Sequence, residues 1–272
     1  MVILIICVAV LCLLACTYLF LIAPAYNARG SLSLGITSFF AHRGLYGGSL
    51  PENSLEAFKN AVGSGCGIEL DVRLSADGEV MVFHDGNLKR MCGVDYPFGA
   101  VTSGNLARLR LDRTNCGIPK LSEVLAAVNG AVPLIIELKG EDKNTELCDK
   151  LFPLLDGYSG VFFIESFNPL LLAYVKKHRP AYIRGQLVDI LSKESYSGSA
   201  IVRFMLSHML LNFLSRPHFI AYNHKKKPFI GIFLCSFLFG AHRFAWTVTD
   251  KKQFDALRLK GIHSIFEGFW PY

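Results

Sequence analysis

Apolar residues follow one another without interruption at the start of the chain. From residue 2 to about residue 24 there is no charged residue, and the first arginine or lysine is Arg29. About 20 apolar residues are enough for a helix to cross ~30 Å of hydrocarbon. A secretory signal peptide would show a basic segment before a shorter apolar one, and neither is present. We therefore predict an uncleaved transmembrane anchor over residues 1–24, followed by a linker over residues 25–36.

One alternative for this segment is a lipid-modified cysteine. The string Leu13-Leu14-Ala15-Cys16 loosely resembles a lipoprotein cleavage box. The apolar run continues well past this box, which favours the anchor. We expect a single-pass protein of the cell membrane. The side on which the rest of the chain lies stays open, because only Arg29 and Arg43 flank the anchor and a basic bias needs more charges.

Beyond residue 36, short β-rich runs alternate with helical patterns. The predicted strands cover residues 35–41, 65–72, 79–84, 132–138, 160–166, 182–188, 218–222, 244–248 and 261–266, with helices over 53–62, 121–128, 146–155 and 169–178. Asp77-Gly78 is a hairpin signal, so the run 79–84 is expected to fold back as an extra arm. Eight strands then remain, each but the last followed by a helix-like segment.

This alternation over about 245 residues is typical of one closed (β/α)8 TIM barrel, here over residues 37–272. An open doubly wound sheet is the alternative. Such a sheet prefers a glycine-rich phosphate loop after its first strand, and His42-Arg43-Gly44 stands there instead.

Composition narrows the possible partners. The net charge of +6 is a mild basic bias, which suits an anionic membrane surface or an anionic substrate. The basic residues are scattered, and no nucleic-acid-binding motif is present in the sequence. Three of the eight cysteines lie in the anchor, and the other five form no C-x-x-C pair, which argues against a zinc site or a disulfide framework.

The region 201–239 is apolar on most faces and contains Lys225, Lys226 and Lys227. Its second apolar run is about 12 residues long, too short to span a bilayer. Two interpretations remain open: barrel helices with buried faces, or a surface that lies on the bilayer with the lysines facing anionic lipid.

Polar residues gather where barrel enzymes place their chemistry, at the carboxyl ends of strands. His42 and Arg43 follow the first strand, and His84 closes the hairpin arm. Glu69 and Asp71 lie two apart on the second strand, and so do Glu137 and Lys139 on the next. A spacing of two places each pair on one face of its strand.

These residue types fit phosphoryl chemistry. The carboxylates of Glu69, Asp71 and Glu137 suit a hard divalent cation, Ca²⁺ or Mg²⁺. His42 and His84 are candidates for general acid and general base. Arg43 and Lys139 would hold phosphate oxygens. Each residue alone has an ordinary structural explanation, and the joint arrangement carries the hypothesis.

The set of motifs resembles one enzyme family. The segment AHRGLYGGSLPENSLEAFKNAVGSGCGIELDVRLSADGEVMVFHDGNLKRMCG is similar to the N-terminal signature of glycerophosphodiester phosphodiesterases. IELK at 136–139, ESFNP at 165–169 and AWTV at 245–248 agree with it, and the likeness extends over about residues 37–271.

The resemblance implies a TIM barrel that hydrolyses glycerophosphodiesters to sn-glycerol 3-phosphate and an alcohol. It implies metal ligation by Glu69, Asp71 and Glu137, and acid–base roles for His42 and His84. The glycerol 2-hydroxyl would attack first and give a cyclic phosphate that water opens. Which histidine is the acid in which step stays open, as does the choice between Ca²⁺ and Mg²⁺.

One departure concerns the last strand. Family members commonly end it with Thr-Asp, where this chain has Glu267-Gly268. We expect this departure to alter the rim of the site, which contacts the leaving alcohol. The core of the site should not depend on it. Phe167 and Trp246 are candidates for lining the substrate pocket. A purely structural role as core aromatics is an equally open alternative.

Two other functions remain. The same site could cleave lysophospholipids at the membrane surface on the headgroup side, since the anchor and the apolar region would favour a lipid substrate. The chain could also bind phosphate ligands without turnover, which the full set of histidines, carboxylates and lysine argues against.

Overall fold

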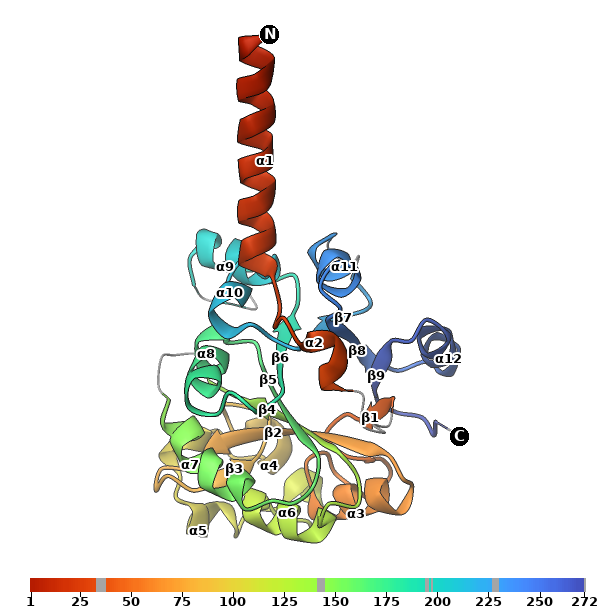
Figure 1. Ribbon diagram of the computed structural model, residues 1–272. Helices are drawn as coiled ribbons and strands as arrows, with labels where there is room; N and C mark the ends of the chain where they lie inside the picture. The colour runs from red at the N-terminus through yellow and green to blue at the C-terminus, as the bar shows by residue number, and fades with distance from the viewer. Residues whose placement is uncertain (33–37, 141–144, 194–195, 197, 227–229, 272) are drawn as a thin grey trace.

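The computed structural model describes the chain except for residues 33–37, 141–144, 194–195, 197, 227–229 and 272. Its described part is a barrel of eight parallel strands surrounded by helices, which confirms the predicted fold (Figure 1). The barrel strands are β1 (Phe39–Ala41), β2 (Gly67–Leu74), β4 (Leu134–Leu138), β5 (Phe162–Ser166), β6 (Arg184–Val188), β7 (Phe219–Asn223), β8 (His242–Val248) and β9 (His263–Phe266).

The barrel closes because β1 pairs in parallel with both β2 and β9. β3 (Val80–Val82) stands outside the ring and pairs antiparallel with the end of β2, with Val72 opposite Val82. The predicted hairpin excursion at Asp77-Gly78 is therefore confirmed. Its consequence is geometric: the antiparallel return brings the residues after β3 back to the level of Asp71, where the Phe83 amide donates to the Asp71 carbonyl at 2.9 Å.

Most helices cover the outside of the barrel. They are α3 (Leu55–Gly63), α6 (Leu121–Val128), α7 (Glu146–Asp156), α8 (Pro169–His178), α9 (Ala200–Ser207), α10 (Asn212–Ser215), α11 (Ile230–Phe237) and α12 (Lys251–Leu259). The segment between β3 and α6 adds α4 (Lys89–Cys92), η1 (Phe98–Ala100), α5 (Ser103–Leu106) and η2 (Leu111–Arg113). It buries a small apolar cluster of its own around Phe83, Phe98 and Leu106.

The start of α3 differs from the sequence prediction. The N-cap is Ser54, whose hydroxyl accepts from the Ala57 amide, and not Asn53. Asn53 adopts a left-handed backbone conformation with φ of 55° and turns its side chain into the barrel. A serine is as good an N-cap as an asparagine, so the two neighbouring residues could not be told apart by pattern alone.

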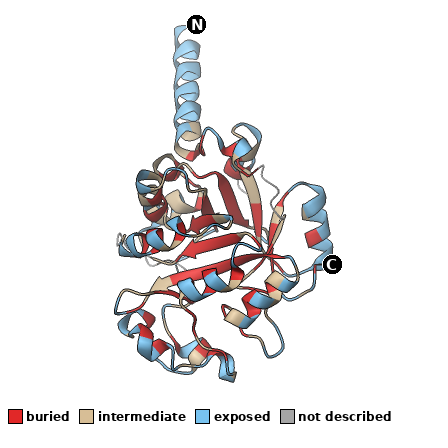
Figure 2. Cartoon of the chain, turned by 60° about the horizontal axis from the view of Figure 1, so that its bottom comes forward, coloured by how far each residue is buried: buried red, intermediate tan, exposed pale blue. Residues whose placement is uncertain are grey.

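The barrel interior is apolar at one end. Phe40, Phe163, Phe219 and Phe244 fill it together with Ile135. A second and larger apolar layer lies between the strands and the outer helices, which is why the strands are buried on both faces in Figure 2. Leu32, just after α2 (Ala28–Ser31), packs into the interior cluster. Part of the expected linker is thus packed against the barrel.

α1 (Val2–Ile22) is exposed along most of its length and projects away from the barrel (Figures 1 and 2). Among the described residues, α1 is the one helix that is both long enough and apolar enough to cross a membrane. In the part of the chain that the structure describes, α1 packs against the rest of the protein from Tyr18 onward, and Ile22 is fully buried there.

A matched pair of leucines tests the packing. Leu151 in α7 is fully buried, whereas Leu259 in α12 is 89% exposed. Leu151→Ala should lower the free energy of unfolding by about 3–5 kcal/mol, because it removes buried methyl groups and leaves a cavity. Leu259→Ala should change it by less than about 0.5 kcal/mol. Denaturant unfolding of the full chain in detergent measures both, and equal effects would contradict the described packing.

Candidate active site at the barrel mouth

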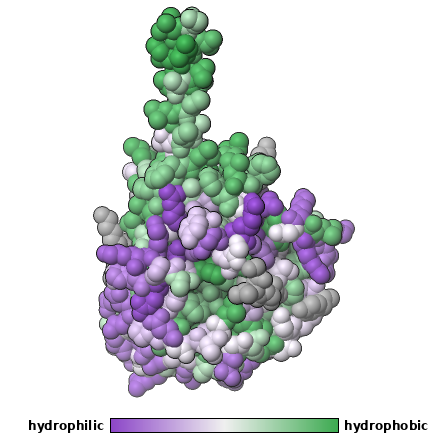
Figure 3. Space-filling model, in the orientation of Figure 1, coloured by the Kyte–Doolittle hydropathy of each residue, from purple (hydrophilic) through white to green (hydrophobic). Residues whose placement is uncertain are grey.

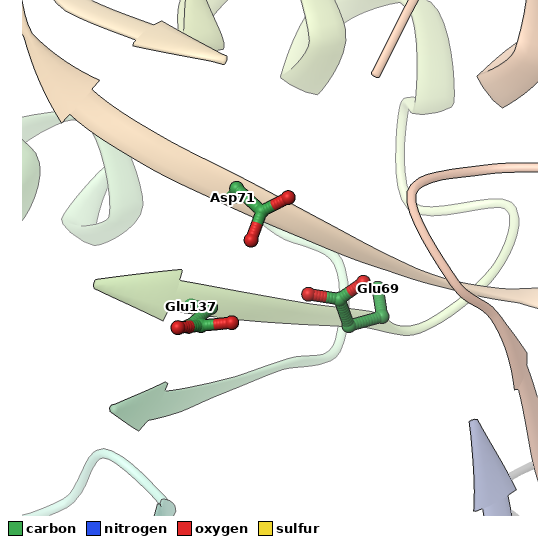
Figure 4. A group of neighbouring side chains, drawn as sticks. All are labelled: Glu69, Asp71 and Glu137. Atoms are coloured by element: carbon green, nitrogen blue, oxygen red, sulfur yellow. The ribbon is translucent and has the colours of Figure 1, made fainter. Parts of the chain in front are cut away.

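The strand register brings the predicted acidic residues together. β2 and β4 are neighbours, with Asp71 opposite Glu137 and Glu69 opposite Ile135. Figure 4 shows Glu69 and Asp71 projecting from β2 and Glu137 from β4 into one space. Each carboxylate offers an oxygen within 4.8 Å of the others, and all three side chains are buried. The period-two spacing in the sequence therefore describes the geometry correctly.

Burial and mutual repulsion perturb these acids. Burial, with Asp71 and Glu137 nearby, raises the pKa of Glu69 well above its usual value. Burial also raises the pKa of Glu137 to about 7, although Lys139 opposes the shift. Burial acts on Asp71 in the same sense, but Lys139 and Arg43 outweigh it and lower the pKa of Asp71. The protein thus supplies too little positive charge to stabilise the ionised carboxylates of Glu69 and Glu137.

Two basic side chains supply the positive charge that is present. Lys139 Nζ lies 2.9 Å from Asp71 Oδ1 and 2.7 Å from Glu137 Oε1. Arg43 Nε lies 3.4 Å from Asp71 Oδ2, and the Arg43 amide donates to Glu69 Oε2 at 3.0 Å. That amide reaches Glu69 because Arg43 has a positive φ of 56°. Asn53 Nδ2 adds a hydrogen bond to Asp71 Oδ2 at 2.8 Å.

A fourth acid increases the imbalance. Glu165 on β5 is the register partner of Glu137, is 1% exposed, and has an Oε2 without a hydrogen-bond partner among the described residues. Burial, with Glu69 and Glu137 nearby, raises its pKa well above the usual value. Four buried carboxyl groups thus face two half-buried cations, Arg43 and Lys139. An uncompensated buried charge is costly, so these donors fit a hard divalent cation held by oxygen ligands.

Each predicted histidine has a carboxylate partner. His42 Nδ1 lies 2.6 Å from Glu267 Oε2, and its Nε2 lies 4.0 Å from Glu69 Oε2. His84 Nδ1 lies 2.6 Å from Asp85 Oδ1. A carboxylate only accepts, so Nδ1 donates in both rings and Nε2 is the atom left for chemistry. The contact of His42 Nε2 with Glu69 and the hydrogen bond of the Phe83 amide to the Asp71 carbonyl bring both histidines to the edge of the acidic cluster.

Glu267 lies closer to the candidate residue His42 than the sequence predicts. We expected the Glu267-Gly268 departure to affect only the rim of the pocket. Instead, the end of β9 runs beside the end of β1, with the His42 amide donating to the Phe266 carbonyl at 2.9 Å. The Glu267 side chain therefore meets the His42 ring directly, and Tyr46 also hydrogen-bonds to it.

The sequence reasoning missed a chain of ion pairs that lies beside these groups. Arg90 contacts Glu52 Oε1 at 2.6 Å and Asp85 Oδ2 at 2.6 Å, and Glu52 also pairs with Arg43 at 2.8 Å. The chain Arg43–Glu52–Arg90–Asp85 thus links the loop after β1 to the loop after β3. The motif Pro51-Glu52-Asn53 was visible in the sequence, but its partner Arg90 lies in a helix that only folding brings near.

The two candidate pocket aromatics meet each other. Phe167 follows β5 and Trp246 lies on β8, with ring centroids 5.7 Å apart in an edge-to-face arrangement. Both are half-buried and pack against the interior aromatic cluster. They therefore form the boundary between that cluster and the charged end of the barrel.

A closed parallel barrel that gathers carboxylates, cations and imidazoles on its strand ends has the architecture of a TIM-barrel enzyme. The model of the glycerophosphoryl diester phosphodiesterase family matches residues 42–269, and the chain belongs to this family.

Individual relatives agree with this membership. A glycerophosphodiester phosphodiesterase of Bacillus altitudinis is 37% identical over 111 residues, which are 38% of this chain and 45% of that protein. The match thus spans about half the length of that relative. The crystal structure of a glycerophosphodiester phosphodiesterase from Thermotoga maritima has a TM-score of 0.64 at 27% identity and covers 86% of this chain and 95% of its own.

A third comparison concerns the fold alone. A phosphodiesterase of Oleispira antarctica, solved in complex with the product sn-glycerol-3-phosphate, has a TM-score of 0.70 at 23% identity. It covers 85% of this chain and 93% of its own.

Binding of a divalent cation by the acidic cluster can be tested directly. Mg²⁺ or Ca²⁺ should raise the melting temperature of the protein, because a ligand at 100 times its dissociation constant adds about 2.7 kcal/mol of stability. Asp71→Asn should remove most of that increment. Asp95→Asn, which alters an exposed ion pair with Lys89, should leave it unchanged. Calorimetric titration of the full chain measures the affinities, and an Asp71→Asn protein that binds as the wild type does would exclude this site.

Proposed function

We propose that this protein hydrolyses glycerophosphodiesters to sn-glycerol 3-phosphate and an alcohol. The observation that carries the proposal is the joint geometry of the site. Glu69, Asp71 and Glu137 surround one space, and two imidazoles held by carboxylates stand beside it. Membership of the family and the likeness to the Thermotoga maritima enzyme support the same reaction.

Glu69, Asp71 and Glu137 would hold a divalent cation, Ca²⁺ or Mg²⁺, which when bound polarises a phosphoryl oxygen. Arg43 and Lys139 would bind phosphate oxygens, the first through its fork of N–H donors and the second as a point charge. Both already lie within ion-pair distance of Asp71, so an anionic diester that binds them joins a preformed set of charges.

The surroundings of the two histidines differ, and we infer different roles from that. Burial lowers the pKa of His84, and the charge of its partner Asp85 is shared with Arg90. His84 is therefore suited to accept the proton of the attacking hydroxyl. Glu267 Oε2 accepts a hydrogen bond from His42 Nδ1 at 2.6 Å, which fixes the ring and leaves Nε2 to face a bound diester. His42 is suited to deliver its Nε2 proton to the oxygen of the leaving alcohol.

The organisation of the chain follows the same proposal. Residues 1–24 would anchor the protein in the cell membrane as a single span, and residues 37–272 would form the catalytic barrel on one side of it. The exposed, charge-free surface of α1 supports the anchor. A lysophospholipid is the second candidate substrate, because apolar side chains of α9 and α11 are exposed close to α1 and would favour a substrate presented by lipid.

Turnover assays test the reaction and the site together. The wild type should release glycerol 3-phosphate and choline from glycerophosphocholine, or lysophosphatidate and choline from lysophosphatidylcholine micelles, and EDTA should abolish the activity. His42→Ala should lower kcat by about 10²–10⁴-fold, since a positioned proton donor contributes that much. Glu56→Gln, an exposed change in α3, is the control with normal rates. Wild-type rates in His42→Ala would refute the assignment, and the faster substrate identifies the preferred class.

Glu267→Gln separates the two proposed histidine roles. The variant keeps the shape of the side chain but no longer carries a negative charge beside His42 Nδ1. We expect kcat on glycerophosphocholine to fall about 10–100-fold with little change in KM. A diester with a nitrophenol leaving group should lose less than about threefold, because that group departs without a proton. Equal losses on both substrates would show that His42 does not protonate the leaving oxygen.

A further inference from the structure

The last turn of α1 is fixed to the barrel domain by side chains that cap its free carbonyls. Asn212 Nδ2 donates to the Ile22 carbonyl at 3.1 Å, and Cys235 Sγ lies 3.2 Å from the same oxygen. Arg216 Nη1 donates to the carbonyls of Phe20 and Ala23 at 3.0 and 2.8 Å. The last carbonyls of a helix have no partner inside the helix, and here the domain provides partners from two separate segments.

Packing strengthens this attachment. The Arg216 guanidinium lies over the Phe20 ring at 4.8 Å, and Phe20 contacts Phe213 with ring centroids 5.8 Å apart. Beyond the helix, the Ala25 amide donates to the Pro217 carbonyl, and Leu32 is buried in the barrel interior. α1 therefore leaves the domain in one defined direction instead of hanging from an open linker.

Two neighbouring helices expose apolar side chains at the same end of the molecule. On α9, Ile201 is 72% and Phe204 56% exposed; on α11, Ile230, Phe233 and Phe237 are 69%, 55% and 66% exposed. We name these five side chains the apolar collar. In α11 the opposite face, with Ile232 and Cys235, is buried, and the helix has no charged residue. A helix that is apolar all round needs a non-aqueous partner on both faces.

The collar is continuous with the surface of α1. Figure 1 shows α9 and α11 on either side of the base of α1. On the face that Figure 3 shows, apolar residues lie at that base and hydrophilic surface begins further down. A bilayer that takes up the exposed length of α1 must have its boundary where this helix ends. The collar stands at that level, which selects lipid over a second protein as its partner.

We propose that the collar inserts into the headgroup–acyl boundary of the leaflet in which α1 ends, so that the barrel is held on the membrane in one orientation. The proposal rests on the membrane anchoring proposed above and not on the catalytic activity. Three apolar side chains of α11 and two of α9 would enter the lipid, each gaining the free energy of removing its apolar surface from water. Lys225, which is exposed just before α11, would meet the headgroups.

Photo-crosslinking in lipid vesicles tests this. Full-length protein carrying the photoreactive residue p-benzoylphenylalanine at one site is reconstituted into vesicles of phosphatidylcholine and phosphatidylglycerol. Positions 204 and 233 probe the collar. Position 259 is the matched control, because Leu259 is also apolar and exposed but lies in α12. Position 11, in the exposed part of α1, reports on the anchor itself.

We expect lipid adducts at positions 11, 204 and 233, with at least about fivefold less at position 259. Adducts at position 11 without adducts at 204 and 233 would overturn the collar while leaving the anchor intact. Equal labelling at 233 and 259 would mean a loosely tethered barrel, and crosslinks to a second copy at 233 would assign the collar to a protein contact. A lack of adducts at all four positions would reject the anchor as well.

Discussion

The structure depends on one electrostatic constraint, the burial of more negative than positive groups inside the mouth of a barrel. Glu69, Asp71, Glu137 and Glu165 are buried there, and Arg43 and Lys139 are the cations among them. Water cannot solvate these charges, so the protein must neutralise them by protonation or by a bound cation. Glu69 and Glu137, whose pKa values burial raises, hold protons that a metal ion can replace.

The barrel satisfies this constraint by separating its interior into two zones. Along β4 and β5 the same inward face carries Ile135 and Phe163 first, then Glu137 and Glu165 two residues later. The apolar zone supplies the packing that holds the strands in register. The fold therefore tolerates the unfavourable repulsion between the buried carboxylates of the charged zone. Phe167 and Trp246 stand between the zones and give the charged end an apolar wall.

Sequence reasoning succeeded where the information is local. Alternation of strands and helices predicted the barrel, and the spacing of two predicted which acids share a face. It was less successful where the partner comes from a distant loop. Arg90 joins Glu52 to Asp85, and Glu267 reaches His42 across 225 positions of sequence. Such pairs depend on how β9 lies beside β1 and how the segment after β3 packs, and neither is encoded in a local pattern.

Glu267 shows why these distant contacts matter for the chemistry. The two histidines are equivalent by type, and each has a carboxylate 2.6 Å from Nδ1. Their carboxylates differ, because Asp85 also pairs with Arg90, whereas Glu267 receives its other hydrogen bond from the neutral hydroxyl of Tyr46. The departure at the last strand therefore puts a carboxylate in direct contact with the ring of a proposed catalytic histidine, and Glu267 belongs to the site itself and not to its rim.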